Sequence, residues 1–228
     1  MNAARRRALF AALARDNPQP RGELEYASDF QLLVAVVLSA QATDRSVNAA
    51  TRGLFAAAPT PAALLALGEA GLVAHIRTIG LFRTKARNLL ALCAQLLANH
   101  AGAVPRTREA LEALPGVGRK TANVVLNIAF GEPSIAVDTH VFRVANRTGL
   151  APGTTVRAVE DALVAAVPAA YRQHAHHWLI LLGRYTCKAR KPECWRCPVA
   201  RYCTYDLKSP APQAGTAKVR APRKPGAR

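Results

Sequence analysis

Four cysteines near the C-terminal end of the chain have the spacing that points most directly to chemistry. They follow the pattern C-x6-C-x2-C-x5-C, at Cys187, Cys194, Cys197 and Cys203. Structural zinc sites usually combine two close pairs of ligands, whereas here only Cys194 and Cys197 are close in the sequence. Four thiolates on one compact loop suit a [4Fe–4S] cluster, so the spacing favours iron–sulfur and leaves zinc as the alternative.

Three basic residues, Lys188, Arg190 and Lys191, lie between the first two of these cysteines. Their side chains could contact the phosphates of a nucleic acid. They could also balance the negative charge of a thiolate cluster, and the two roles are compatible.

The stretch LPGVGRKT, at residues 114–121, is the second candidate site. It joins a short predicted helix, capped by Thr107, to an apolar predicted helix over residues 119–129. Gly116 and Gly118 permit positive φ, so amide groups at the turn and the second helix could face a phosphate together. The phosphate loop of nucleotide hydrolases, G-x-x-x-x-G-K-[ST], is not matched at either glycine. An ordinary helical corner is the alternative, and the adjacent Arg119 and Lys120 favour DNA.

The charge of the chain supports a polyanionic partner. The 228 residues include 31 Lys and Arg but only 14 Asp and Glu, giving a net charge of +17. Residues 207–228 carry six basic residues and no acidic one, so residues 1–206 still carry +11. A folded domain this basic is typical of nucleic-acid binding. A membrane partner is not favoured, because no apolar run is long enough to span one and the cations are not gathered on one amphipathic helix.

The N-terminus only superficially resembles a secretory signal. Three arginines at residues 5–7 precede a short apolar run, but charged residues follow at once and no cleavage site is present. We expect an amphipathic helix that buries Leu9, Ala12 and Leu13, in a cytoplasmic protein that associates with DNA and keeps its thiols reduced.

The remaining pattern predicts an all-α fold. No pair of alternating strand-length runs occurs, and helices begin at Ser, Thr or Asp caps. The proline-rich basic residues 207–228 are expected to form a disordered tail. The helices are expected at residues 28–38, 44–57, 60–78 in short pieces, 83–99, 139–147, 154 or 155–166, and 171–185.

Taken together, these motifs resemble the endonuclease III family, bifunctional DNA glycosylases of the helix–hairpin–helix superfamily. The resemblance is carried by LSAQATD at residues 38–44, LPGVGRKTANVV at 114–125, VDTHVFRV at 137–144 and the four-cysteine loop. It covers about residues 1–206. It implies two helical domains flanking a DNA-binding cleft: residues 23–132 with the helix–hairpin–helix motif, and residues 1–22 plus 133–206 with the cluster.

The resemblance also implies roles for individual residues. A damaged base must be flipped out of the duplex, and Gln41 and Leu81 match the positions that fill the gap. Lys120 would attack C1′ of the sugar, with its pKa lowered by the helix N-terminus and Arg119, or would only bind a phosphate. Asp138 would stabilise developing positive charge, or would only cap a helix. Without the resemblance, Leu81 reads as a core residue.

The implied DNA contacts are Gln41, Leu81, Gly116, Gly118, Arg119 and Lys191. The expected partner is double-stranded DNA with damaged pyrimidines or abasic sites, cut by a monomeric enzyme. A monofunctional adenine glycosylase of the same superfamily is the nearest rival, but that group lacks the lysine found here at Lys120. A non-catalytic iron–sulfur DNA-binding protein is the rival from another class. The three histidines His174, His176 and His177 lack the spacing of a helical metal pair and are expected to be structural.

Overall fold

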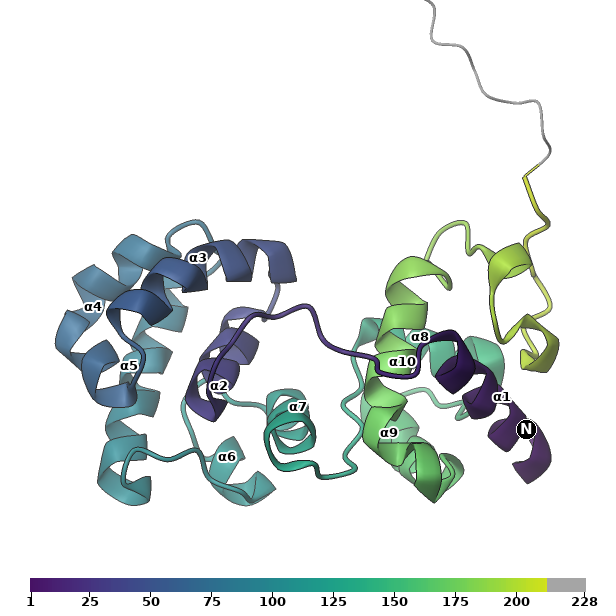
Figure 1. Cartoon of the computed structure of the whole chain (residues 1–228), viewed down its shortest axis with the longest axis horizontal. Coiled ribbons are helices and arrows are strands. Elements are labelled where there is room, and N and C mark those ends of the chain that lie inside the picture. The colour runs from purple at the N-terminus through teal and green to yellow at the C-terminus, as the bar shows by residue number, and fades with distance from the viewer. Residues whose placement is uncertain (213–228) are drawn as a thin grey trace, which may run out of the picture.

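The computed structural model describes residues 1–212, and these residues form helices without any strand (Figure 1). The predicted all-α class is therefore confirmed. Three short 3-10 segments accompany the longer helices: η1 Ala169–Tyr171, η2 Cys194–Arg196 and η3 Ala200–Tyr202. The α-helices are α1 Ala3–Asp16, α2 Asp29–Leu38, α3 Asp44–Ala57, α4 Pro61–Ile76, α5 Phe82–His100, α6 Arg108–Glu112, α7 Arg119–Phe130, α8 Thr139–Thr148, α9 Val156–Ala166 and α10 Arg172–Tyr185.

Short polar side chains start most of these helices, as the sequence predicts. Each accepts a hydrogen bond from an otherwise unpaired N–H group of the first turn. At the start of α2, the Ser28 hydroxyl accepts from the N–H of Gln31, and the Gln31 side chain accepts in turn from the N–H of Ala27. The N-caps that bond in this way are Asn2, Ser28, Thr43, Thr60, Thr107, Asp138 and Thr155.

Helix α4 is broken near its middle. Gly68 adopts a φ of 63° there, which a residue with a side chain rarely accepts. The short helical pieces expected between residues 60 and 78 are therefore present, joined in one continuous segment.

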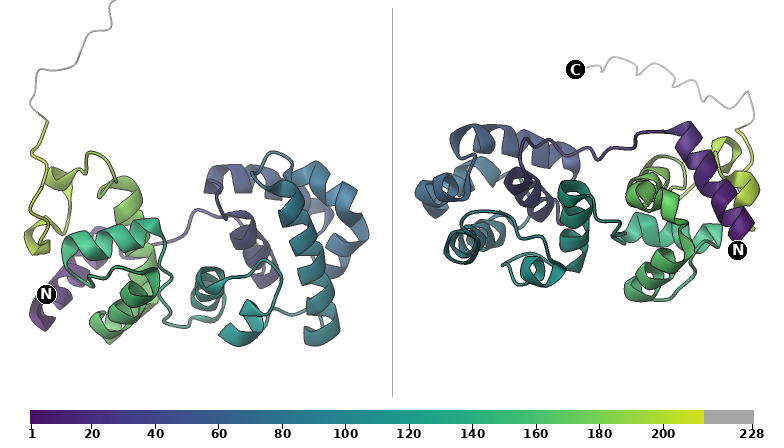
Figure 2. Two further views of the ribbon diagram at one scale, coloured as in Figure 1. Left: turned by 180° about the vertical axis from the view of Figure 1, so that it is seen from behind. Right: turned by 60° about the horizontal axis from the view of Figure 1, so that its bottom comes forward.

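The helices form two lobes, each around its own apolar core (Figures 1 and 2). Helices α2 to α7 make the first lobe, and α1 with α8 to α10 makes the second. The chain crosses between the lobes twice, through residues 17–28 and 131–138 (Figure 2). This double crossing explains why no linker composition marks a boundary in the sequence. The expected division at residues 22/23 and 132/133 stays a prediction.

Helix α1 joins the second lobe by the apolar face that the sequence predicts. Its Leu9, Phe10, Ala12 and Leu13 are buried. The Phe10 ring stacks at 5.8 Å from Tyr171, and both rings pack against Trp178. Aromatic packing of this kind adds about 0.5–1.5 kcal/mol per pair beyond the area buried. The N-terminal residues are thus an integral part of a core built mainly from the C-terminal third of the chain.

Within residues 1–212, no single helix is long and apolar enough to cross a membrane. Only the pair α3 and α4, bent by 113°, meets the length and hydropathy criteria jointly.

The expected disordered tail is only partly described, because residues 213–228 lie outside the described residues. Its first residues contact the cysteine loop. The Ser209 hydroxyl accepts from the N–H of Cys194 at 3.2 Å, and the Lys208 ammonium donates to the Cys203 carbonyl at 2.9 Å. The described part of the tail therefore packs against the second lobe.

Gly183 allows α8 and α10 to approach closely, and this contact is testable. An ideal Cβ at this position would lie 2.8 Å from the His140 Cβ and 3.1 Å from its carbonyl oxygen. We expect Gly183→Ala to lower the free energy of unfolding by about 1–3 kcal/mol, because the helices must separate. Chemical denaturation measures this change.

Gly53→Ala is the matched control for that experiment. Gly53 is an exposed helical glycine whose Cβ would meet only the His75 ring, at 3.4 Å. This variant should be neutral or more stable by up to about 1 kcal/mol. Equal destabilisation by the two variants would contradict the close-approach explanation.

Candidate active site and metal centre

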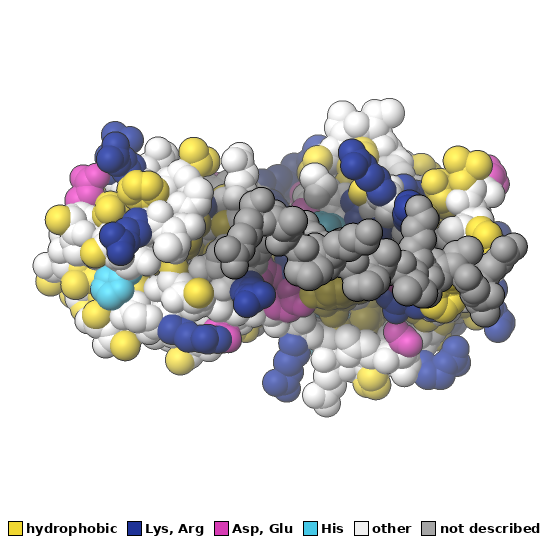
Figure 3. All heavy atoms as spheres, turned by 90° about the horizontal axis from the view of Figure 1, so that it is seen from above, with side chains coloured by type: hydrophobic (Ala, Val, Ile, Leu, Met, Phe, Trp, Pro, Cys, Tyr) yellow, Lys and Arg dark blue, Asp and Glu magenta, His cyan; other side chains and the backbone are white. Residues whose placement is uncertain are grey.

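A cleft of about 990 Å³ borders the predicted catalytic residues. Residues 39–44 form one wall, and the first turns of α8 and α9 form the other. Lys120 and Asp138 both line it, so two residues 18 positions apart in the sequence come together there. Seen from above, Lys and Arg side chains occur on both halves of the surface, and acidic side chains are visible near the middle (Figure 3).

Lys120, in the first turn of α7, faces Asp138, the N-cap of α8. The Lys120 Nζ lies 3.8 Å from the Asp138 Oδ2. The Lys120 side chain is 52% exposed, whereas that of Asp138 is only 11% exposed. The amine can therefore be reached from solvent, whereas the carboxylate is mostly buried.

The two oxygens of Asp138 have different partners. Oδ1 accepts from the N–H groups of His140 and Val141 at 2.9 and 2.8 Å, which caps α8. Oδ2 is left to face Lys120. The two interpretations of Asp138, helix cap and active-site carboxylate, are thus geometrically compatible. Because the cap fixes the orientation of the carboxylate, it also fixes the direction of Oδ2.

The glycine turn before α7 leaves the start of that helix open. Gly116 has a φ of 79°, and a Cβ there would also meet the Asn88 side chain at 3.1 Å. Gly118 is the N-cap of α7 and provides no side chain to bond the first N–H groups. A Cβ at Gly118 would meet no atom within 4 Å. Amide donors beside open space are what a phosphate requires.

Arg119 has a different environment from the one expected for a free cation beside Lys120. Its guanidinium forms a two-pronged ion pair with the buried Glu160 of α9, with Nη2 at 2.7 Å from Oε1. The Glu112 Oε1 lies 3.9 Å from the Arg119 Nη1. The hydrogen bond to Glu160 raises the pKa of Arg119 above its ordinary value. These two carboxylates offset part of the charge that Arg119 presents near Lys120, and the pair with Glu160 connects α7 to the second lobe. Its contact with DNA stays a prediction.

Gln41 and Leu81 both adopt left-handed backbone conformations, with φ of 54° and 60°. Leu81 is 61% exposed, so its interpretation as a core residue is wrong. Lys191 is also exposed, with φ of 52°. Among residues 1–212, Ala101 is the one other non-glycine residue with positive φ. Three of four such strained positions thus coincide with predicted DNA contacts, as expected where surrounding structure imposes a functional geometry.

Two residues that the sequence did not single out also line the cleft. Arg184 of α10 pairs with Asp44 at 2.5 Å and with Glu23 at 2.8 Å. Burial disfavours the charge of Arg184, but the hydrogen bond to Asp44 and nearby carboxylates raise its pKa overall. Asp44 lies in the LSAQATD motif, which was the available signal. Nothing local in the sequence marks Arg184.

The histidines of α10 pack in the interior of the protein or on its surface. His176 is buried, and its Nδ1 lies 2.9 Å from the Ala136 carbonyl. Burial, followed by the charge of His177, lowers the pKa of His176 to about 4, so its ring is neutral at pH 7. His174 is exposed and packs edge-on against Trp178. His177 is also buried, and its Nδ1 has no hydrogen-bond partner among residues 1–212, so the structural role expected for the three histidines stays a prediction.

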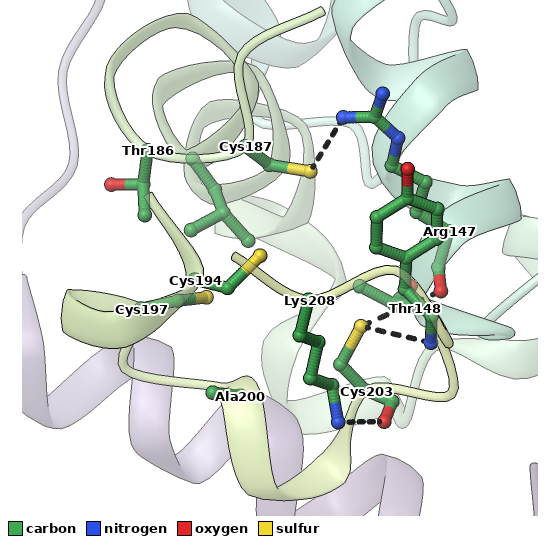
Figure 4. A pocket seen from close by; sticks show the side chains of 11 residues that line it. Arg147, Thr148, Thr186, Cys187, Cys194, Cys197, Ala200, Cys203 and Lys208 are labelled. Carbon is green, nitrogen blue, oxygen red and sulfur yellow. Dashed lines mark hydrogen bonds between the residues drawn. The ribbon is translucent and has the colours of Figure 1, made fainter. Parts of the chain in front are cut away.

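The four predicted metal ligands line one pocket in the second lobe (Figure 4). Arg147 donates to the Cys187 Sγ at 3.7 Å, and the Tyr205 N–H donates to the Cys203 Sγ at 3.4 Å. Donors directed at sulfur suit an anionic thiolate cluster. Burial raises the pKa of Cys197 to about 11, and a bound metal cation would act in the opposite direction by stabilising the thiolate. The residues present therefore fit an iron–sulfur cluster.

The basic arc, residues 188–193 between Cys187 and Cys194, has part of its positive charge balanced by Glu193 of the same segment. Lys188 pairs with Glu193, which also binds Arg196. Arg147 holds the arc by donating to the carbonyls of Lys188 and Ala189 at 2.7 and 3.0 Å. Lys191 is left exposed at the surface of this arc, as a phosphate contact would require.

Comparisons of sequence with known proteins agree with this geometry. Residues 34–169 match the family model "HhH-GPD superfamily base excision DNA repair protein", and residues 187–203 match "Iron-sulfur binding domain of endonuclease III". Endonuclease III of Rickettsia conorii is 58% identical over 86% of this chain and 94% of its own length. Endonuclease III of Escherichia coli strain K12 is 57% identical over 91% of this chain and 99% of its own.

Comparisons of structure give the same result. A solved "Structure of a non-covalent Endonuclease III-DNA Complex" has a TM-score of 0.83 and 45% identity, over 90% of this chain and 96% of that one. A thermostable thymine-DNA glycosylase, 23% identical with a TM-score of 0.79, shares the fold. The chain therefore belongs to the endonuclease III family: it is a DNA glycosylase with AP lyase activity in base excision repair and holds a [4Fe–4S] cluster.

Proposed function

We propose that this enzyme removes oxidised pyrimidines from duplex DNA and then cuts the strand at the abasic site, with Lys120 as the nucleophile. The observation that carries the proposal is the 3.8 Å approach of the exposed Lys120 amine to Asp138 at the edge of the cleft. A trapped covalent DNA intermediate has been solved for a relative that is 45% identical, which supports a covalent mechanism here.

DNA would bind across both lobes. The net charge of +11 on residues 1–206 supplies attraction to phosphates, and the uncapped start of α7 supplies amide donors. Gly116, Gly118 and Lys191 would hold the backbone without reading sequence. Arg119 would contribute chiefly by fixing α7 against Glu160, with any phosphate contact made beside that ion pair.

Gln41 and Leu81 would fill the space left by the flipped nucleotide. Both project from turns of the first lobe, and both are exposed. The two turns adjoin, since a Cβ on Gly80 would lie 3.8 Å from the Gln41 carbonyl oxygen. A polar amide and an apolar side chain delivered together suit a gap that has an unpaired base on one side and stacked bases on the others.

The chemical steps can be assigned to the two catalytic residues. The neutral Lys120 amine attacks C1′, the glycosidic bond breaks, and the base leaves with the bonding electrons and takes up a proton. Asp138 stabilises the positive charge that develops on the sugar and accepts the proton lost by the amine. The C1′–O4′ bond then breaks as the nitrogen lone pair forms the C=N bond of a Schiff base, and O4′ takes up the proton that Asp138 accepted. Loss of a C2′ proton expels the 3′ phosphate, and water then releases Lys120.

The cluster has a structural role in this proposal. Metal binding contributes folding free energy to the loop that carries its ligands, here Cys187, Cys194, Cys197 and Cys203. An ordered loop would hold Lys191 against the DNA backbone. We further propose that the two lobes are domains divided at residues 22/23 and 132/133, and that the enzyme is a cytoplasmic monomer.

If Lys120 is the nucleophile, substitutions at this position should separate covalent trapping from DNA binding. Lys120→Gln and Lys120→Arg should both abolish borohydride trapping on DNA with an oxidised pyrimidine, because neither side chain offers a neutral amine. Lys120→Arg keeps the positive charge and should bind the DNA with nearly unchanged affinity. Gel electrophoresis of trapped complexes measures the first property, and titration at fixed salt measures the second.

A simple phosphate-binding role for Lys120 predicts the opposite pattern. In that case Lys120→Arg would retain turnover at saturating DNA, and Lys120→Gln would lose affinity alone. Undiminished trapping by Lys120→Gln would falsify the assignment and point to another amine.

The two roles of Asp138 can be separated by a matched pair of variants. Asp138→Asn should retain the helix cap, because an amide oxygen also accepts from the first-turn N–H groups. Its base excision should still fall by about a hundredfold or more, because the negative charge is lost. Asp138→Ala should lose the same activity and in addition about 1 kcal/mol of stability.

Trapping on abasic DNA is the control for Asp138→Asn, since that substrate has no base to expel. This trapping should persist. A variant that excises bases normally would restrict Asp138 to capping α8.

A further inference from the structure

Lys85 is a buried cation that the catalytic mechanism does not use. It lies in the first turn of α5 and is only 6% exposed. Its ammonium donates to the carbonyls of Leu38 and Ala40, at 2.9 and 2.7 Å. Within residues 1–212 no carboxylate pairs with it, and burial lowers the pKa of Lys85. The ammonium is stabilised instead by the partial negative charge at the C-terminal end of α2.

The carbonyls that Lys85 binds belong to the segment that carries Gln41. Leu38 ends α2, and Ala40 immediately precedes Gln41. Without Lys85 these two carbonyls would lose the donors that the structure gives them, at a turn where Gln41 is held in a left-handed conformation.

The same residue is bonded to the turn that carries Leu81. The Lys85 N–H donates to the Leu81 carbonyl at 3.0 Å, which closes the first turn of α5. Leu81 has no side chain that can cap this helix, and its backbone is left-handed. One residue thus connects the two adjoining turns, by its side chain to one and by its main chain to the other.

We propose that Lys85 is a positioning residue that holds segment 39–43 and turn 79–81 in fixed register, so that Gln41 and Leu81 enter the duplex as one unit. The inference rests on the proposed function for the insertion step alone. A buried ammonium costs desolvation that an apolar side chain would avoid, so filling space is not a sufficient reason for a lysine here. The main-chain bond to Leu81 does not depend on the side chain, but donating to the carbonyls of Leu38 and Ala40 at once requires a side chain with more than one donor.

The first test measures the turns themselves by amide hydrogen exchange of the full chain with its cluster. Lys85→Met keeps the length of the side chain but removes its donors. Exchange should accelerate in peptides that cover residues 39–43 and 79–84, and should stay unchanged in α8 and α10. Unchanged exchange in both turns, or accelerated exchange throughout the first lobe, would overturn the proposal. This measurement needs no DNA, so it is independent of the proposed function.

The second test separates insertion from chemistry. Under single-turnover conditions, Lys85→Met should slow excision of an oxidised pyrimidine from duplex DNA by about ten- to hundredfold, the equivalent of one or two lost charged hydrogen bonds. Cleavage at an abasic site in single-stranded DNA should be unchanged, because no stack has to be filled. Equal loss on both substrates would make Lys85 a general structural residue. Inactivity of the wild type on the damaged duplex would overturn the proposed function instead.

Two further variants keep the result decisive. Lys85→Arg retains the cation and several donors, so it should recover much of the duplex activity, and it replaces Lys85→Met if that protein does not fold. Thr51→Val removes a buried hydroxyl that bonds the Val47 carbonyl at 3.0 Å, elsewhere in the first lobe. It should lose stability without changing the ratio of the two activities. The same ratio change in Thr51→Val as in Lys85→Met would contradict a positioning role.

Discussion

The divided carboxylate of Asp138 is the interaction on which the active site depends. One oxygen is fixed by two N–H groups at the start of α8, so the other has a defined direction toward Lys120. Lys120 is in turn fixed at the start of α7, behind a turn that needs Gly116 at positive φ. The amine that we propose as the nucleophile and its carboxylate therefore lie at two helix N-termini. The site requires that the two helices, which belong to different lobes, keep a constant separation.

Two ion pairs between the lobes help to keep this separation constant. Arg119 of α7 binds Glu160 of α9, and Arg184 of α10 binds Asp44 of α3, so each pair connects the lobes. The Glu160 side chain is almost fully buried, so removing Arg119 would leave an uncompensated buried carboxylate. Arg119, the residue next to Lys120, thus helps to fix the distance between the lobes. This contact is additional to the role beside Lys120 that the resemblance implied for Arg119.

The local features of this molecule could be predicted from sequence and the distant ones could not. Thr107 and Asp138 cap the helices as predicted, because a capping bond spans two or three residues. The partner of Arg119 lies 41 residues away on another helix, and no periodicity reveals it. Leu81 shows the same limit differently. An apolar residue at a turn is normally buried, but the tertiary structure holds it outward at φ of 60°. The resemblance to a family identified that position, whereas elementary patterning did not.

The left-handed backbone of the exposed residues Gln41 and Leu81 and the buried ammonium of Lys85 are parts of one structural unit. An inserting side chain must project from the surface with little freedom, since freedom lost on binding DNA would weaken the complex. Left-handed backbone at Gln41 and Leu81 provides the projection, and donors from Lys85 oppose relaxation of the turns. The cost in stability falls on the free protein, before any DNA is bound. The large apolar core of the first lobe, from Phe30 to Leu126, is what allows the fold to sustain that cost.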